Sequence, residues 1–167
     1  MIRTVLFIAV FFALKGLLAQ ENAEKYRLMA AKTNEAIELD GKLLEGFWSK
    51  AQPADQFMKN FPEDSVLAID QTVIKLAFND NSLYIGGICY EGSGKDDIIT
   101  SLRRDFNFGD NENISVYIDP FNDYTNGFTF GLTPLGVRRE GLVTNGSDVR
   151  TDWDNKWYSA VNQYEDR

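Results

Sequence analysis

The sequence contains no histidine and only one cysteine, Cys89, among its 167 residues. Without histidine, the chain cannot build a Ser-His-Asp or Cys-His catalytic site, and it cannot bind zinc through imidazole. A single cysteine excludes an intramolecular disulfide. Its apolar neighbours in "LYIGGICY" predict a small, buried side chain at this position. These absences remove the most familiar hydrolase and zinc chemistries.

Basic residues are also scarce, with 17 Lys and Arg against 25 Asp and Glu and a net charge of -8. A chain of this charge offers no basic stripe to neutralise phosphates, which argues against nucleic acid as a partner. An acidic surface suits neutral polar ligands and hard cations. There are only four prolines. Of the residues, 44% are hydrophobic and 13% aromatic, which gives the chain enough apolar side chains for the core of one packed domain.

The longest apolar run, "VLFIAVFFAL" (Val5–Leu14), is too short to span a bilayer. It follows Arg3 and precedes the small residue Ala19, an arrangement that predicts a cleaved signal peptide over residues 1–19. Lys15 leaves an uncleaved anchor as the alternative. We therefore expect an exported protein in the periplasm, the outer membrane or the extracellular space. Residues 20–36 are predicted to be a linker or short helix, and residues 37–167 the domain.

Short alternating segments dominate the rest of the chain. Thr72–Phe78 and Leu83–Tyr90 flank the turn formers "NDNS", which predicts a hairpin. Further strands are predicted at Asn113–Asp119, Phe128–Thr133, near Val137 and at Trp157–Tyr164. A brief strand near Ile37, an Asp40-Gly41 turn and a helical turn carrying Phe47 and Trp48 precede them, and we expect Trp48 to be a core residue. The pattern predicts an all-β antiparallel sandwich. The chain stops directly after an alternating run, so we expect a piece of a longer protein, incomplete at its C-terminus.

The stretch "TDWDNKW", residues 151–157, is the first candidate binding site. An indole can stack on the apolar face of a sugar, while Asp152, Asp154 and Asn155 supply hydrogen bonds to its hydroxyls. In an extended chain the two indoles would lie roughly 13 Å apart, too far to clamp one ring. Trp157 opens an alternating run, so we expect it to pack in the core. Trp153 is the residue we expect to carry function.

The second candidate site is the acidic segment from Arg103 to Asp123. Oxygen-rich loops suit calcium, which takes six to eight oxygen ligands. The alternative is a solvated loop in which Asp and Asn cap turns. The spacing does not fit an EF-hand. The metal candidates are Asp110, Glu112, Asp119 and Asp123.

Two further features of this segment leave alternatives open. Arg103 and Arg104 either pair with neighbouring aspartates or, beside a binding loop, fork two hydrogen bonds to a ligand. The many carboxylates single out no pair with the separation that glycoside hydrolysis needs. An enzyme therefore has no support from this sequence.

Four segments in order resemble the family 9 carbohydrate-binding module, in the version found at the N-terminus of large secreted or outer-membrane bacterial proteins. They are "IELDGKLLEGFW", "VIKLAFNDNSLYIGG", "RRDFNFGDNENISVYIDPFNDYTNGFTFGLTPLGV" and "WDNKWYSAV". The resemblance implies a β-sandwich that binds sugars through paired tryptophans and carries structural calcium. Trp153 and Trp157 match the tryptophans, and Arg104 and Asp105 match an Arg-Asp pair. The chain departs from the family pattern at Arg138-Arg139-Glu140, where an aspartate often follows a Gly-Val turn.

Three functions follow as predictions. The first is a non-catalytic domain that binds an oligo- or polysaccharide through Trp153, Trp157, Arg104, Asp105, Asp154 and Asn155. The second is a periplasmic accessory or plug domain that binds protein, serving an outer-membrane β-barrel domain of the same parent protein. The third is the binding part of a larger glycoside hydrolase whose catalytic residues lie outside this chain. Fold alone does not decide among them.

Overall fold

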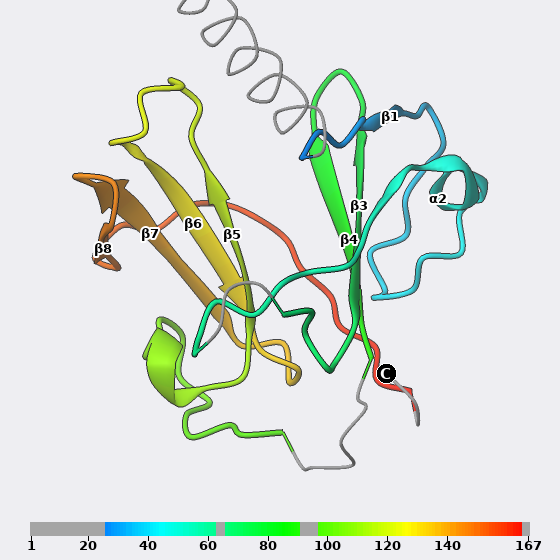
Figure 1. Cartoon of the computed structure of the whole chain (residues 1–167). Coiled ribbons are helices and arrows are strands. Elements are labelled where there is room, and N and C mark those ends of the chain that lie inside the picture. Colours follow the sequence, from blue (N-terminus) through cyan, green and yellow to red (C-terminus); the bar gives the residue numbers. More distant parts are fainter. Residues whose placement is uncertain (1–25, 63–65, 91–96, 165–167) are drawn as a thin grey trace, which may run out of the picture.

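The computed structural model describes residues 26–62, 66–90 and 97–164, and in this part of the chain the fold is all-β with almost no helix. The strands form two four-stranded sheets (Figure 1). The first sheet contains β1 (Ala31–Lys32), β2 (Pro53–Ala54), β3 (Thr72–Phe78) and β4 (Leu83–Cys89). The second contains β5 (Ile114–Ile118), β6 (Gly127–Leu132), β7 (Arg138–Thr144) and β8 (Asp148–Arg150). All strand pairs are antiparallel except the short β1–β3 pair.

The predicted hairpin forms the centre of the first sheet. β3 and β4 pair along their whole length, from Thr72 opposite Cys89 to Phe78 opposite Leu83. The side chain of Asn79 closes the turn by accepting hydrogen bonds from the backbone N–H groups of Asn81 and Ser82, both at 2.9 Å. The hairpin was predictable because turn chemistry and alternation are both local.

One face of this hairpin carries a small hydrophobic core. The helix α2 (Gly46–Lys50) buries Phe47 and Trp48 against Ala77 of β3. The two aromatic rings lie 4.6 Å apart. Gly86 of β4 is required here, because a β-carbon would lie about 3 Å from the Leu43 and Trp48 side chains. The expectation that Trp48 is a core residue is confirmed.

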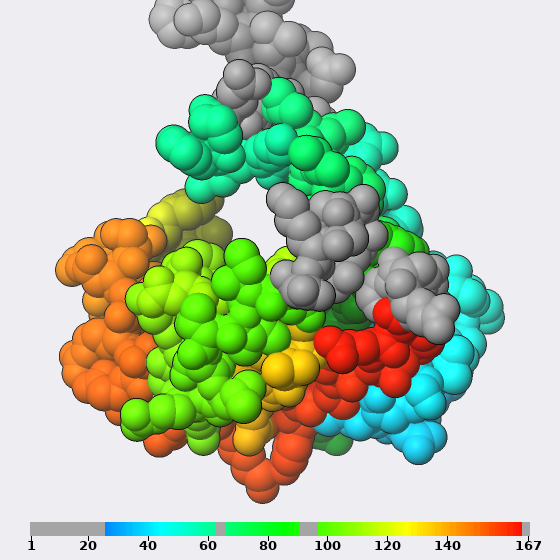
Figure 2. Space-filling view, turned by 90° about the horizontal axis from the view of Figure 1, so that it is seen from below, coloured from blue at the N-terminus to red at the C-terminus, as the bar shows by residue number. Residues whose placement is uncertain are grey.

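The opposite face of the hairpin is apolar but only partly covered. Register places Leu76 opposite Ile85 and Phe78 opposite Leu83 on this face. Phe78, Ile85 and Leu83 are 37%, 39% and 54% exposed. A view from below shows an opening between the turquoise segment that precedes β3 and the lime-green segment that precedes β5 (Figure 2).

The second sheet contains three predicted strands and one that was not predicted. β5 and β6 match the expected alternating runs, with Val116 opposite Phe130 and Ile118 opposite Phe128 on one face. The expected strand near Val137 is β7, which begins one residue later and pairs with β6. The three-residue strand β8 was not predicted. The residue that faces the core side of β7 opposite Phe130 is Glu140.

Several expectations about secondary structure are wrong. Trp157–Tyr164 is not a strand, and neither is the segment around Ile37. Residues 31–32, expected to lie in a linker or short helix, form β1 and pair with the end of β3. Cys89 is exposed, because it ends β4 at the edge of its sheet.

The predicted signal peptide lies outside the described residues. In the part of the chain that the structure does describe, no helix is both long and apolar enough to cross a membrane.

Candidate binding site

Trp153 and Trp157 lie over one face of the second sheet, where β6 presents two phenylalanines. Trp153 stacks on Phe128 with ring centroids 5.0 Å apart and an interplanar angle of 29°. Trp157 meets Phe130 edge-on, with centroids 5.3 Å apart. Both tryptophans are half-buried. The residues after β8 therefore fold back across the sheet and cover its aromatic face.

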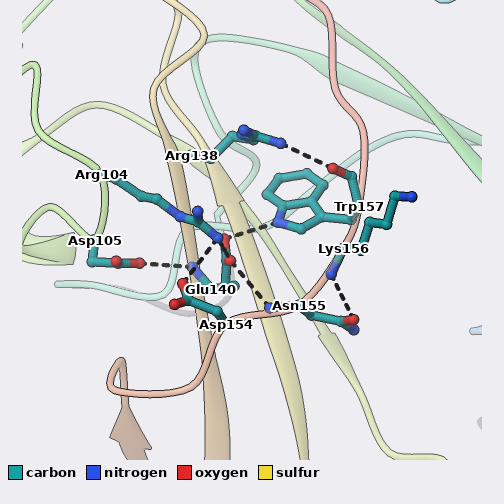
Figure 3. A network of polar contacts seen from close by, with 8 residues as sticks. All are labelled: Arg104, Asp105, Arg138, Glu140, Asp154, Asn155, Lys156 and Trp157. Atoms are coloured by element: carbon teal, nitrogen blue, oxygen red, sulfur yellow. Dashed lines mark hydrogen bonds and ion pairs between the residues drawn. The ribbon is translucent and has the colours of Figure 1, made fainter.

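A completely buried carboxylate, that of Glu140, anchors this segment (Figure 3). Its Oε2 accepts a 2.9 Å hydrogen bond from the indole Nε1–H of Trp157. Its Oε1 accepts a longer one, 3.4 Å, from the backbone N–H of Asn155. The same oxygen forms an ion pair with the guanidinium of Arg104. A buried charge is tolerated only when it is paired in this way.

Arg104 connects the buried carboxylate to the surface. Its Nη2 also lies 3.1 Å from Oδ1 of Asp154, whose side chain is mostly exposed. The Arg104 side chain is 43% exposed, whereas that of Glu140 is fully buried. Of the alternatives for Arg104, ion pairing is what the structure shows. Its partners are 36 and 50 residues further along the chain rather than sequence neighbours.

Arg138 holds Trp157 from the other side. Its Nη1 donates a 2.9 Å hydrogen bond to the backbone carbonyl of Trp157. The guanidinium carbon also lies 5.9 Å from the centre of the indole ring, within the range of a cation–π contact. The ring, the N–H and the carbonyl of Trp157 all have partners within the protein. These contacts hold Trp157 against the protein, although its side chain is half-buried rather than in the core.

Asp105 connects the segment before β5 to β7. It has a positive φ of 59°, and its backbone N–H donates to the carbonyl of Arg138 at 3.0 Å. Its carboxylate accepts a 3.3 Å bond from the backbone N–H of Glu140. Burial raises the pKa of Asp105, and the positive charge of Arg104 opposes that rise. Asp105 thus positions the strand that carries Glu140.

Each of the four metal candidates accepts a hydrogen bond within the protein, and Asp119 and Asp123 do so in the same loop. Asp110 accepts a 2.7 Å bond from the Asn107 side chain beside the 3-10 helix η1 (Phe108–Asp110), and Glu112 accepts one from the Ile98 backbone. Asp119 accepts backbone bonds within its own loop, from Phe121 and Tyr124 among others. Asp123 does the same for Thr125 and Asn126. Within the described ranges, no group of three or more acidic or thiol side chains is arranged to hold a metal ion.

These loop hydrogen bonds also shift acidity. The backbone N–H of Tyr124, with those of Asp123 and Phe121, lowers the pKa of Asp119. The side chain and backbone of Asn126 lower the pKa of Asp123 well below its usual range. Both carboxylates are charged at neutral pH and fix the shape of the loop between β5 and β6.

The structure thus brings together Trp153, Trp157, Arg104, Asp154 and the Asn155 backbone, with Asp105 behind them. It adds Glu140, Arg138, Phe128 and Phe130, which were not predicted as site residues. Glu140 could have been noticed, because in "RREGLV" it occupies the same alternating phase as Leu142. An acid at a core position needs a buried partner.

No protein-family model, no curated protein and no solved structure matches the chain.

Proposed function

We propose that this chain is a non-catalytic binding domain whose ligand is a glycan, with Trp153 as the stacking residue. The observation that carries the proposal is the Trp153–Phe128 stack at 5.0 Å and 29°. Phe128 supports one side of the indole, and the side chain of Trp153 remains partly exposed. A ring held in this way loses little freedom when a sugar stacks on it.

Polar groups beside Trp153 complement this role. Asp152, Asp154 and Asn155 are exposed, and Arg104 exposes 43% of its side chain. Carboxylate, amide and guanidinium groups match the donors and acceptors of sugar hydroxyls. Because the N–H of Trp157 is bonded to Glu140, Trp157 supports the site without offering its own polar group to the ligand.

The finer architecture we propose is an antiparallel β-sandwich of the family 9 carbohydrate-binding module type. In its support, a side-chain carbon at Gly87 of β4 would lie 3.3 Å from Cδ1 of Ile114 on β5, so the two sheets approach each other at this point. Export of the protein and calcium binding in the loop region remain predictions of the same proposal.

A second candidate function, an accessory domain that binds protein, is favoured by a different observation. The face of the β3–β4 hairpin that looks away from α2 exposes large apolar side chains, including Phe78, Leu83 and Ile85. Exposed apolar surface of this kind is typical of protein interfaces.

Calorimetric titration with a panel of oligosaccharides tests the first proposal. Each titration is carried out once with calcium and once with chelator. The protein should bind one glycan class saturably, and Trp153→Ala should abolish binding. The matched control is Trp157→Phe, which keeps the ring and removes the N–H, and should bind as the wild type does. If the folded, calcium-replete protein binds no member of the panel, the glycan proposal is wrong and the accessory role gains support.

A further inference from the structure

The second sheet carries a hollow of about 200 Å³ at the end where β5 leads into β6. Tyr117 of β5, Gly127 of β6 and Val143 of β7 line it, and the glycine leaves no side chain in the space between its neighbours. A β-carbon at Gly127 would lie 2.5 Å from the carbonyl oxygen of Ile118. The hollow is smaller than the roughly 300–1,000 Å³ of sites for drug-sized ligands, so it suits a small chemical group.

Two loops form the wall of this hollow, and hydrogen bonds join them. The backbone N–H of Gly146, in the β7–β8 turn, donates to the carbonyl of Thr125 in the β5–β6 loop at 2.9 Å. Gly146 has a positive φ of 79°, and a β-carbon there would lie 3.1 Å from the carbonyl oxygen of Tyr124. The carboxylate of Asp119 accepts a 2.9 Å bond from the N–H of Tyr124. The wall is therefore fixed before any ligand arrives.

Two tyrosines line the hollow with much of their surface available to a ligand. Tyr117 is 55% exposed and Tyr124 is 83% exposed. Tyr124 also has a φ of 57°, in the left-handed region that is unfavourable for a bulky residue. Backbone strain of this kind gathers at ligand-binding sites. The face of a tyrosine ring carries partial negative charge, which attracts cations.

The charge of the hollow is negative. Asp119 is the only charged residue among the ten described residues that line it. The loop N–H groups, led by that of Tyr124, hold the pKa of Asp119 below its ordinary value, so this carboxylate is charged at neutral pH. Each of its oxygens has two lone pairs and can accept from a ligand as well as from the backbone. The net charge of -8 on the whole chain adds to the attraction for a cation.

We propose that this hollow binds a small organic cation, an alkylammonium group that contacts the rings of Tyr117 and Tyr124 and pairs with the carboxylate of Asp119. Ring faces with one opposite charge are what an alkylammonium group requires. Calcium, in contrast, takes six to eight oxygen ligands, and one carboxylate supplies two at most.

Choline and dimethylbutanol, its uncharged isostere in which carbon replaces the nitrogen, test the proposal on the wild-type protein. Saturation-transfer difference NMR measures the binding of each at physiological salt. We expect choline to bind saturably and about tenfold more tightly than the isostere, because only choline offers a positive charge to the rings and to Asp119. Absence of choline binding, or equal binding of the two compounds, would overturn the proposal. Neither compound contains a sugar, so the result is independent of the glycan proposal.

The double variant Tyr117→Leu and Tyr124→Leu locates the site. Leucine keeps an apolar side chain at each position but removes the ring, so we expect choline to bind about tenfold more weakly. The matched control is Phe121→Leu, which removes an exposed ring from the same loop outside the lining of the hollow and should bind choline as the wild type does. Circular dichroism checks that both variants are folded. A folded double variant with unchanged affinity for choline would show that the site is wrong.

Discussion

The indole N–H of Trp157 donates a 2.9 Å hydrogen bond to the carboxylate of Glu140, which has no exposed surface. This bond joins the segment after β8 to the inner face of β7, and Arg104 neutralises the same carboxylate from the segment before β5. Three parts of the chain, far apart in sequence, therefore meet at one buried charge. Trp153 lies four residues before Trp157 on the same segment, and its own stack on Phe128 also holds it in place.

Glu140→Gln should destabilise the fold. The amide keeps the volume of the side chain but removes the charge that balances Arg104, and its NH₂ group would face a donor. We expect a loss of about 2 kcal/mol in the free energy of unfolding, within the range for an unsatisfied buried group. Urea denaturation measures it. Asp154→Asn, which alters only the exposed partner of Arg104, should change stability by about 0.5 kcal/mol or less. Equal effects in the two variants would show that burial of Glu140 is unimportant.

Arg104→Met should also be costly, while Arg103→Met should not. Removing Arg104 leaves Glu140 with only its two N–H donors. Because part of the guanidinium is exposed to water, we expect about 2–3 kcal/mol, below the full cost of breaking a buried pair. Arg103 is exposed and serves as the matched control. The same denaturation assay compares them, and similar midpoints for the two variants would contradict the assigned ion pair.

Trp157→Phe should lower stability without affecting ligand binding. Loss of the Nε1–H removes one donor from Glu140, at about 1–2 kcal/mol. The aromatic contact with Phe130 is kept. Thermal unfolding and glycan titration on the same sample separate the two effects. Weaker glycan binding at unchanged stability would mean that Trp157 contacts the ligand directly.

The loop between β5 and β6 should make stability depend on acid pH through Asp119. Its pKa is lowered in the folded state by loop N–H groups, led by that of Tyr124. The stabilisation is therefore complete above the ordinary carboxyl pKa of about 4, and it is lost as pH falls through the lower, folded value. Thermal unfolding from pH 6 downward should show Asp119→Asn less stable than wild type at pH 6, and the gap should narrow in acid.

A chelator separates this effect from any metal. The backbone N–H groups of Phe121 and Tyr124 donate directly to the carboxylate of Asp119. The difference between wild type and Asp119→Asn should therefore persist in chelator. A difference that exists only when calcium is present would instead support the predicted calcium site.

Local features were predictable from the sequence, and long-range ones were not. The β3–β4 hairpin follows from alternation on both sides of "NDNS", and β5 and β6 from similar runs. The fold class follows from these strands. Trp157–Tyr164 alternates equally well but forms no strand. In this segment the backbone carbonyl of Trp157 accepts a hydrogen bond from the side chain of Arg138. Alternating apolar and polar residues indicate that a segment has one side against the protein and one side toward solvent. A segment that crosses the molecule without pairing as a strand has two such sides as well.

The part of the candidate site that lies within residues 151–157 was predictable from the sequence. "TDWDNKW" is a compact cluster of aromatic and polar residues, so Trp153 and its polar neighbours could be identified locally. Glu140 could not be paired with Arg104 from sequence, because 36 residues separate them and many other acids lie closer to Arg104. Cys89 was expected to be buried because its neighbours are apolar. That expectation failed because β4 is an edge strand.

The chain has three tryptophans, and their indole N–H signals in a two-dimensional ¹⁵N NMR spectrum report which of them contacts a glycan. Once assigned by single replacements, they can be followed while the glycan that binds in calorimetry is added. We expect a saturable shift of the Trp153 signal. Those of Trp48, buried beneath α2, and Trp157, bonded to Glu140, should move little. A glycan that shifts Trp157 and leaves Trp153 unchanged, or one that moves none of the three, would contradict this expectation.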